Sequence, residues 1–200
     1  MSRKRFDTIA STVGVLLAAL LLAVSGLALW ANSFINDNVK TQLVAQKVFF
    51  PPAGSDSIND PAVKPYLEKY AGQQLTTGDQ AKAYADHFIA VHLREANGGL
   101  TYSELSTKAR ANPTDTTLPG KVDTAFRGET LRGLLLNAYA FGKMAQIAGY
   151  VALITLGAAG LLLLLSAMGA AHASRTPSDR EVHVPGWHPE KAAPEKAATA

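Results

Sequence analysis

The sequence predicts an all-α membrane protein in which two transmembrane helices bracket an extracytoplasmic bundle of four or five helices. Two stretches without Asp, Glu, Lys or Arg, residues 9–31 and 146–172, predict the spans. Between them, residues 32–145 place apolar side chains at helical spacing and show no period-two alternation of the kind strands require. Residues 1–8 then form a basic cytoplasmic leader and residues 173–200 a disordered cytoplasmic tail.

The first span is long enough to cross a bilayer. It has 23 residues, eleven of them Leu, Ile or Val, and as a helix it covers roughly 35 Å against ~30 Å of hydrocarbon. Arg3, Lys4 and Arg5 precede it, as in a cleaved signal peptide, but the apolar run is too long for a signal core and reaches Trp30, an interfacial residue. We expect a retained anchor with both termini in the cytoplasm of a cell whose plasma membrane it crosses twice.

The middle segment begins as a continuation of the first helix. Residues 31–48 carry one apolar stripe at four-residue spacing and are expected to stop at the prolines 51–52. Asp60 followed by Pro61 has the form of an N-cap with proline at the first helical position, and it predicts a helix that closes at Gly72.

Two capping boxes predict the next helices. Residues 77–80 and 101–104 have the Thr-x-x-Gln and Thr-x-x-Glu spacing, in which the Thr oxygen accepts the amide three residues on and that residue's side chain reaches back. The first helix is expected to end at Gly98 and the second before Pro113. A further helical pattern from Val122 merges with the second span.

Composition and local motifs argue against several classes of function. The net charge is +3 without a cluster of basic residues, and the chain has no cysteine, which argues against nucleic-acid binding, disulfides and thiolate chemistry. His87 and His92 diverge by about 140° on a helix and cannot chelate one ion within it. No Ser or Thr stands in an activating context. The sequence therefore predicts no enzyme, cofactor, metal ion or small-molecule substrate.

Small residues within the spans predict faces where another helix can approach closely. The partner of such a face is either the other span or a second protein chain. The predicted packing residues are Ala10, Gly14, Ala18, Gly149, Gly157 and Gly160.

A group of charges precedes the second span. Arg127 and Arg132 flank Glu129, and two interpretations remain open. Either Glu129 pairs with Arg132 three residues on, or the two arginines form a basic collar that docks an acidic partner surface or anionic lipid.

Three segments, QQLTTGDQA at 73–81, YADHFI at 84–89 and GETLRGLLLNAYAF at 128–141, resemble a group of small two-span membrane proteins of actinobacteria. The resemblance covers roughly residues 1–170 and implies the two-span architecture. Some members bear an aromatic ring-opening dioxygenase label. A non-haem iron site of that kind needs two His and one carboxylate brought together, which the divergent His87 and His92 do not provide.

These observations predict a non-catalytic integral membrane protein that acts by association with lipid and with other membrane subunits. The leading hypothesis is an accessory or stabilising subunit of a larger envelope or respiratory complex. An alternative is an extracytoplasmic ligand sensor that signals through a partner, because the short tail has no room for an output domain. A third is an envelope enzyme.

Overall fold

Residues 2–177, which the computed structural model describes, form helices and no strand. Most of the predicted tail, from residue 178 onward, lies outside the described residues. An isolated bridge joins Phe49 to Gln74. The helices are α1 Arg3–Ala45, α2 Asp56–Asn59, α3 Lys64–Leu67, the 3₁₀ turn η1 Glu68–Tyr70, α4 Gly78–Tyr84, the π turn η2 Ala85–Ile89, α5 Ala90–Asn97, α6 Tyr102–Ala111 and α7 Leu118–Arg175.

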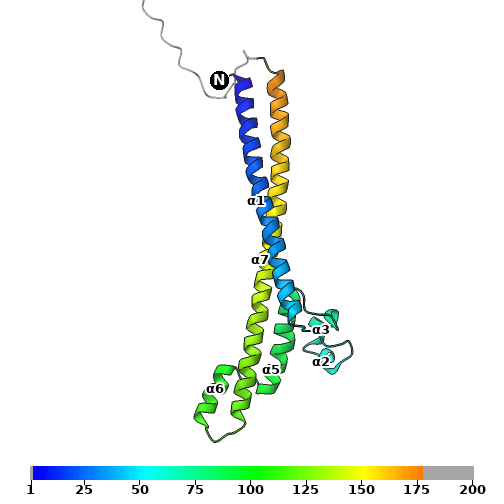
Figure 1. Ribbon diagram of the computed structural model, residues 1–200, viewed down its shortest axis with the longest axis vertical. Helices are drawn as coiled ribbons and strands as arrows, with labels where there is room; N and C mark the ends of the chain where they lie inside the picture. Colours follow the sequence, from blue (N-terminus) through cyan, green and yellow to red (C-terminus); the bar gives the residue numbers. More distant parts are fainter. Residues whose placement is uncertain (1, 178–200) are drawn as a thin grey trace, which may run out of the picture. The chain divides into compact units, whose positions relative to one another are not determined.

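Helices α1 and α7 are each long and apolar enough to cross a membrane. They contain 43 and 58 residues, whereas ~20 residues suffice to span the hydrocarbon core. Each helix therefore continues without a break beyond the span predicted for it (Figure 1). The all-helical class and the two long apolar helices predicted from the sequence are confirmed.

One unit of the fold combines the start of α1, to Ala23, with the end of α7, from Thr155. Small side chains are buried in this unit at seven-residue spacing, so that the same face of each helix packs against the other helix along its length. Large side chains such as Leu16 and Leu164 stay 65% and 66% exposed. The buried small residues are Ser11, Ala18, Ala159, Ser166 and Ala173.

In the second unit, Val24–Ile154, polar contacts at the same seven-residue spacing connect α1 to α7. The Ser25 hydroxyl donates to the Ala152 carbonyl at 2.9 Å. Seven residues along α1, the Asn32 amide donates to the Ala145 carbonyl at 2.7 Å. Because each donor reaches a backbone carbonyl across a helix pair, these contacts fix the register of α1 on α7 within this unit.

The core of the second unit lies among the end of α1, the short helices α2 and α3, and the helix formed by α4, η2 and α5. Phe50 and Leu67 are at most 2% exposed, and each buried side chain of this size stabilises the fold by about 1.5–3 kcal/mol. Figure 1 shows α6 beside the first turns of α7, where Leu105, Leu118 and Ala125 form a second cluster. Other members of the main core are Leu43, Ile58, Val63, Leu75, Ala81, Ala85, Val91 and Leu135.

Both predicted capping boxes are confirmed. The Thr77 hydroxyl accepts the Gln80 amide at 3.2 Å, and the Gln80 side chain accepts the Thr77 amide at 3.1 Å. Thr101 and Glu104 make the same reciprocal pair at the start of α6. The helix that begins at Gly78 ends with Gly98 in the left-handed region, at φ 63°, as its position after the apolar run predicted.

The helix expected from Asp60 begins later than predicted. The Asp60 carboxylate accepts the Ala62 amide at 2.7 Å, and its carbonyl accepts the Lys64 amide at 2.8 Å, so one turn forms here. It does not propagate because Pro65 has no amide hydrogen to donate to the Pro61 carbonyl. Helix α3 therefore starts at Lys64.

Helix α1 also ends earlier than residue 48, at Ala45. Lys47 adopts a left-handed φ of 53°, and beyond it the chain is extended. The Val48 carbonyl accepts the Leu75 amide at 2.9 Å, and the Phe50 amide donates to the Gln73 carbonyl at 2.9 Å. This pairing with a distant segment, rather than the prolines that follow, sets the end of the helix.

Candidate functional site

A groove of about 610 Å³ in the second unit is the candidate site. Residues 34–43 of α1, with Gln46 and Val48 just beyond its end, form one wall. Residues 131–141 of α7 form another, and Tyr84 and Ile89 contribute from the helix that contains η2. Its volume falls within the ~300–1,000 Å³ typical of small-molecule sites.

The groove is lined by apolar and amide side chains and by no charged residue. The stripe of Ile35, Val39 and Leu43 that the four-residue spacing predicted supplies the apolar part of the α1 wall. On α7, Leu134 and Phe141 line the groove while remaining 60% and 53% exposed. The amide side chains in the lining belong to Asn38, Gln42, Gln46 and Asn137.

The π turn η2 shapes the part of the wall that contains Ile89. The Ala90 amide donates to the Ala85 carbonyl five residues earlier. The same carbonyl accepts a second hydrogen bond, from Nε of Arg132 on α7, at 3.0 Å. A π turn inserts one extra residue into a helix, often at a functional site, and here Arg132 ties that turn to α7.

Three ionisable side chains lock this junction. The Arg132 guanidinium lies 3.2 Å from Oδ1 of Asp86, and the Lys82 ammonium hydrogen-bonds to Oδ2. Partial burial opposes ionisation of Asp86, but the hydrogen bonds from Lys82 and Arg132 outweigh it and lower the pKa of its carboxyl. The hydrogen bond to Asp86 also raises the pKa of Lys82. Asp86 and Lys82 are therefore charged at neutral pH, and the contacts of Arg132 with Asp86 and the Ala85 carbonyl hold η2 against α7.

The start of α4 approaches α7 more closely than a side chain would allow. A Cβ atom at Gly78 would lie 2.9 Å from the Ala138 carbonyl oxygen and 3.0 Å from Cα of Tyr139. Next along the chain, Asp79 pairs with Lys143 of α7 at 2.9 Å. The glycine and the ion pair together fix this end of the groove wall.

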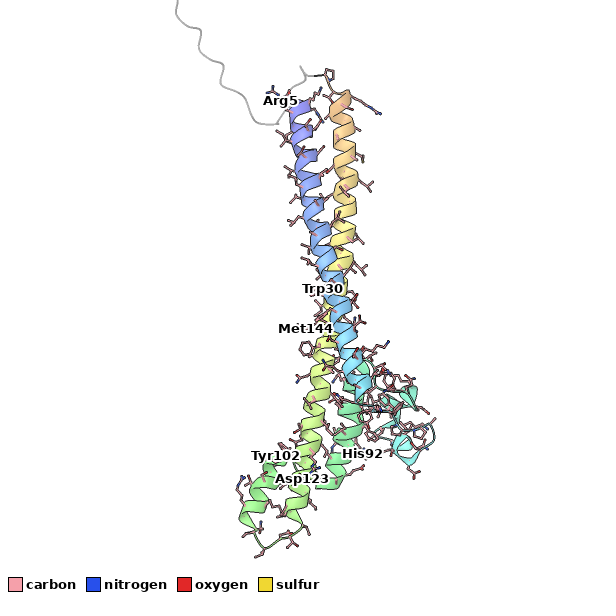
Figure 2. The ribbon with its side chains drawn as sticks, viewed as in Figure 1. Arg5, Trp30, His92, Tyr102, Asp123 and Met144 are labelled. Carbon is pink, nitrogen blue, oxygen red and sulfur yellow. The ribbon has the colours of Figure 1, made fainter. Side chains whose placement is uncertain are left out.

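The two arginines proposed as a collar have different surroundings. Arg127 is 75% exposed and pairs with Asp123 one turn earlier at 2.9 Å. Arg132 is 33% exposed and makes the contacts described above. Glu129 accepts the Tyr102 amide at the start of α6, at 2.8 Å; Tyr102 and Asp123 are labelled in Figure 2. The predicted Glu129–Arg132 pair is therefore not formed. Glu129 instead bonds to the start of α6, and Arg132 bonds to η2.

Three of the predicted packing residues lie between α1 and α7. In the first unit Gly14 and Ala18 are buried, and a Cβ atom at Gly14 would meet the Ser166 hydroxyl. In the second unit a Cβ atom at Gly149 would lie 3.0 Å from the Asn32 amide nitrogen. At both glycines a polar side chain of the facing helix occupies the space that a Cβ atom would take, so a larger residue would displace Ser166 or Asn32.

The other three do not lie at that contact. Ala10 is exposed, and a Cβ atom at Gly157 or Gly160 would meet no atom within 4 Å. Within the described chain these three residues face outward, and the helix contact predicted for them is not made there.

The two middle histidines make separate contacts. The His87 ring stacks on Tyr66 with centroids 3.5 Å apart, and burial lowers the pKa of His87. His92 places Nδ1 2.8 Å from the Phe88 carbonyl oxygen. In residues 2–177 no three His, Asp or Glu side chains are grouped so as to hold a metal ion.

Sequence reasoning missed the groove itself and the polar contacts of Ser25 and Asn32. A signal for the groove was present in the sequence, since Asn38, Gln42 and Gln46 repeat every four residues beside the apolar stripe, at the end of α1 and just beyond it.

The described residues thus define an all-helical protein with two helices long and apolar enough to cross a membrane and an uncharged groove in Val24–Ile154. No protein-family model, curated protein or solved structure matches the chain.

Proposed function

We propose that this is a non-catalytic integral membrane protein that acts by association, as an accessory or stabilising subunit of a larger envelope or respiratory complex. Helices α1 and α7 cross the plasma membrane, both termini are cytoplasmic, and residues 32–145 form an extracytoplasmic helical bundle. The basic residues Arg3, Lys4 and Arg5 before the first span favour this orientation.

The observation that carries the proposal is how the polar groups of the middle domain are used. Charged side chains that converge there bind one another or the backbone of the same domain, as Arg132 does with Asp86 and Ala85. The groove, in contrast, contains no charge. Catalytic sites depend on ionisable groups directed at a substrate, whereas an uncharged apolar hollow favours binding.

The outward glycines of the second span support a protein partner. Gly157 and Gly160 leave room for a helix to approach α7 closely from outside the chain. The large exposed side chains around them, such as Leu161 and Leu164, suit lipid or another transmembrane helix equally well, so the glycines are the residues to test.

The test is recovery of the complex after cross-linking in native membranes and purification in mild detergent. The wild type should retain a second membrane protein in constant ratio, and Gly157→Leu with Gly160→Leu should lose it. Gly26→Leu is the matched control, since a Cβ atom at Gly26 also meets nothing within 4 Å, and it should retain the partner. A wild-type chain recovered only as a free monomer would contradict the proposal.

A second candidate, a ligand sensor that signals through a partner, is favoured by one observation. The groove is walled by α7, and this same helix runs unbroken to Arg175. Cysteines placed at Ser11 and Gly169, which face each other, report on the helix pair in the first unit. Their rate of disulfide formation should change with groove occupancy in a sensor, and stay constant in a stabilising subunit.

A further inference from the structure

We infer that the groove holds one acyl chain of a membrane lipid. The inference rests on the proposed placement of α1 and α7 in the membrane and names a ligand class for the groove. Three properties of the groove support it: its chemistry, its length and its continuity with the apolar surface of the two long helices.

The chemistry of the lining fits an uncharged hydrocarbon chain. No charged residue lines the groove, although α1 carries Asp37 and Lys40 in the same stretch and α7 carries Arg132 and Lys143 nearby. The polar groups along one edge are the neutral amides of Asn38, Gln42 and Gln46. A lining of this kind offers no partner to an ionised ligand.

The length also fits. The α1 wall extends from Phe34 to Gln46, one residue beyond the end of α1, and the eleven helical steps from Phe34 to Ala45 cover roughly 16 Å at ~1.5 Å each. Acyl chains of one leaflet occupy about half of a hydrocarbon core of ~30 Å, or about 15 Å. A single chain can therefore lie along the groove from end to end.

The groove continues into an exposed apolar surface on both helices. Phe34, at one end of the lining, stacks on Trp30 with ring centroids 5.3 Å apart. On α7, Phe141 in the lining is followed by Met144 and Ile147, which are 55% and 61% exposed. Trp30 and Met144 are labelled on the two helices in Figure 2. A chain can pass from the bilayer into the groove without crossing a charged group.

The experiment uses the full chain reconstituted in phosphatidylcholine vesicles that contain a trace of phosphatidylcholine with a diazirine at the end of one acyl chain. Irradiation and peptide mapping then locate the label. A chain in the groove carries its end toward residues 42–48 and 131–135, and these peptides should be labelled. Ala45, the last residue of α1, lies fourteen residues beyond residue 31, roughly 21 Å along the helix, where the end of a bilayer chain does not reach. Label confined to residues 9–31 and 146–172 would overturn the inference.

Charge substitutions supply the control. Leu134→Lys places an ammonium group in the groove and should lower the label at 42–48 roughly tenfold, because a hydrocarbon chain cannot solvate it. Phe49→Lys makes the same change at a side chain that is 55% exposed, close to the 60% of Leu134, but outside the lining. It should leave the label unchanged. Phe141→Lys, at the other end of the groove, is a second blocking variant in case Leu134→Lys does not fold.

The outcomes separate this inference from the proposed function. If the chain and its variants fail to float with vesicles, the membrane placement itself is wrong. If they float and the spans are labelled but the groove is not, only the acyl-chain inference fails. Equal groove labelling in the wild type and both blocking variants would also overturn it.

Discussion

Replacing Gly78 with Ala should destabilise the second unit. The added Cβ atom would lie 2.9 Å from the Ala138 carbonyl oxygen and 3.0 Å from Cα of Tyr139, so backbone must move to admit it. Overpacking of this kind costs about 1–3 kcal/mol. In Gly133→Ala, on α7, the same methyl group meets nothing within 4 Å, and removing glycine from a helix should stabilise by about 0.5–1 kcal/mol. The two variants should therefore differ by about 1.5–4 kcal/mol.

Amide hydrogen exchange of the full chain in detergent measures this difference where it arises. The Leu75 amide, which donates to the Val48 carbonyl at 2.9 Å, reports on opening of the second unit. Exchange changes about tenfold for each 1.4 kcal/mol, so Leu75 should exchange at least tenfold faster in Gly78→Ala than in Gly133→Ala. Exchange in Gly78→Ala at the wild-type rate or slower would refute the close approach of α4 to α7.

Three further predictions concern polar contacts of the second unit, each measured on the full chain in detergent. Arg132→Ala should lower the free energy of unfolding by about 1–3 kcal/mol because it removes two hydrogen bonds of a charged, half-buried group. Arg127→Ala should lower it by less than about 0.5 kcal/mol. Equal losses for the two variants in calorimetry would contradict the different roles given to these arginines. Burial lowers the pKa of His87 below its ordinary 6.5, so the unfolded chain takes up more protons as the pH falls through that value and stability declines below it. The melting temperature should thus fall between about pH 7 and about pH 5. This fall should be less steep in His87→Gln and as steep as in the wild type in His92→Gln. An unchanged slope in His87→Gln would show that another group is responsible. Asn32→Ala, which loses the 2.7 Å bond to the Ala145 carbonyl, should destabilise the α1–α7 contact by about 0.6 kcal/mol, and faster exchange of amides 28–36 checks this.

The parts of the fold that could be predicted from the sequence are those determined by neighbouring residues. The capping boxes at Thr77 and Thr101 and the end of a helix at Gly98 each depend on groups within four residues of one another. Periodicity likewise predicted the stripe of Ile35 and Val39 that lines the groove.

The parts that could not be predicted depend on distant residues. The Ala85 carbonyl in the π turn accepts a hydrogen bond from Arg132, 47 residues away, and no local sequence pattern predicts this turn. The start of α3 was missed because Asp60 and Pro61 form an acceptable N-cap locally, while Pro65 interrupts the helix that would follow. In an alanine-rich helix small residues occur on several faces, so the spacing that predicts a contact at Gly157 does not distinguish it from Ala159, which the structure buries.

Single-cysteine labelling tests directly whether α1 and α7 cross the membrane and place the groove outside the cytoplasm. The chain has no native cysteine, so Ala53→Cys, in an exposed loop of the second unit, and Ser2→Cys, before α1, each provide a unique thiol. A membrane-impermeant maleimide added to intact cells should label Ala53→Cys at once and Ser2→Cys only after the cells are permeabilised. Labelling of Ser2→Cys in intact cells, or protection of Ala53→Cys until permeabilisation, would contradict the account.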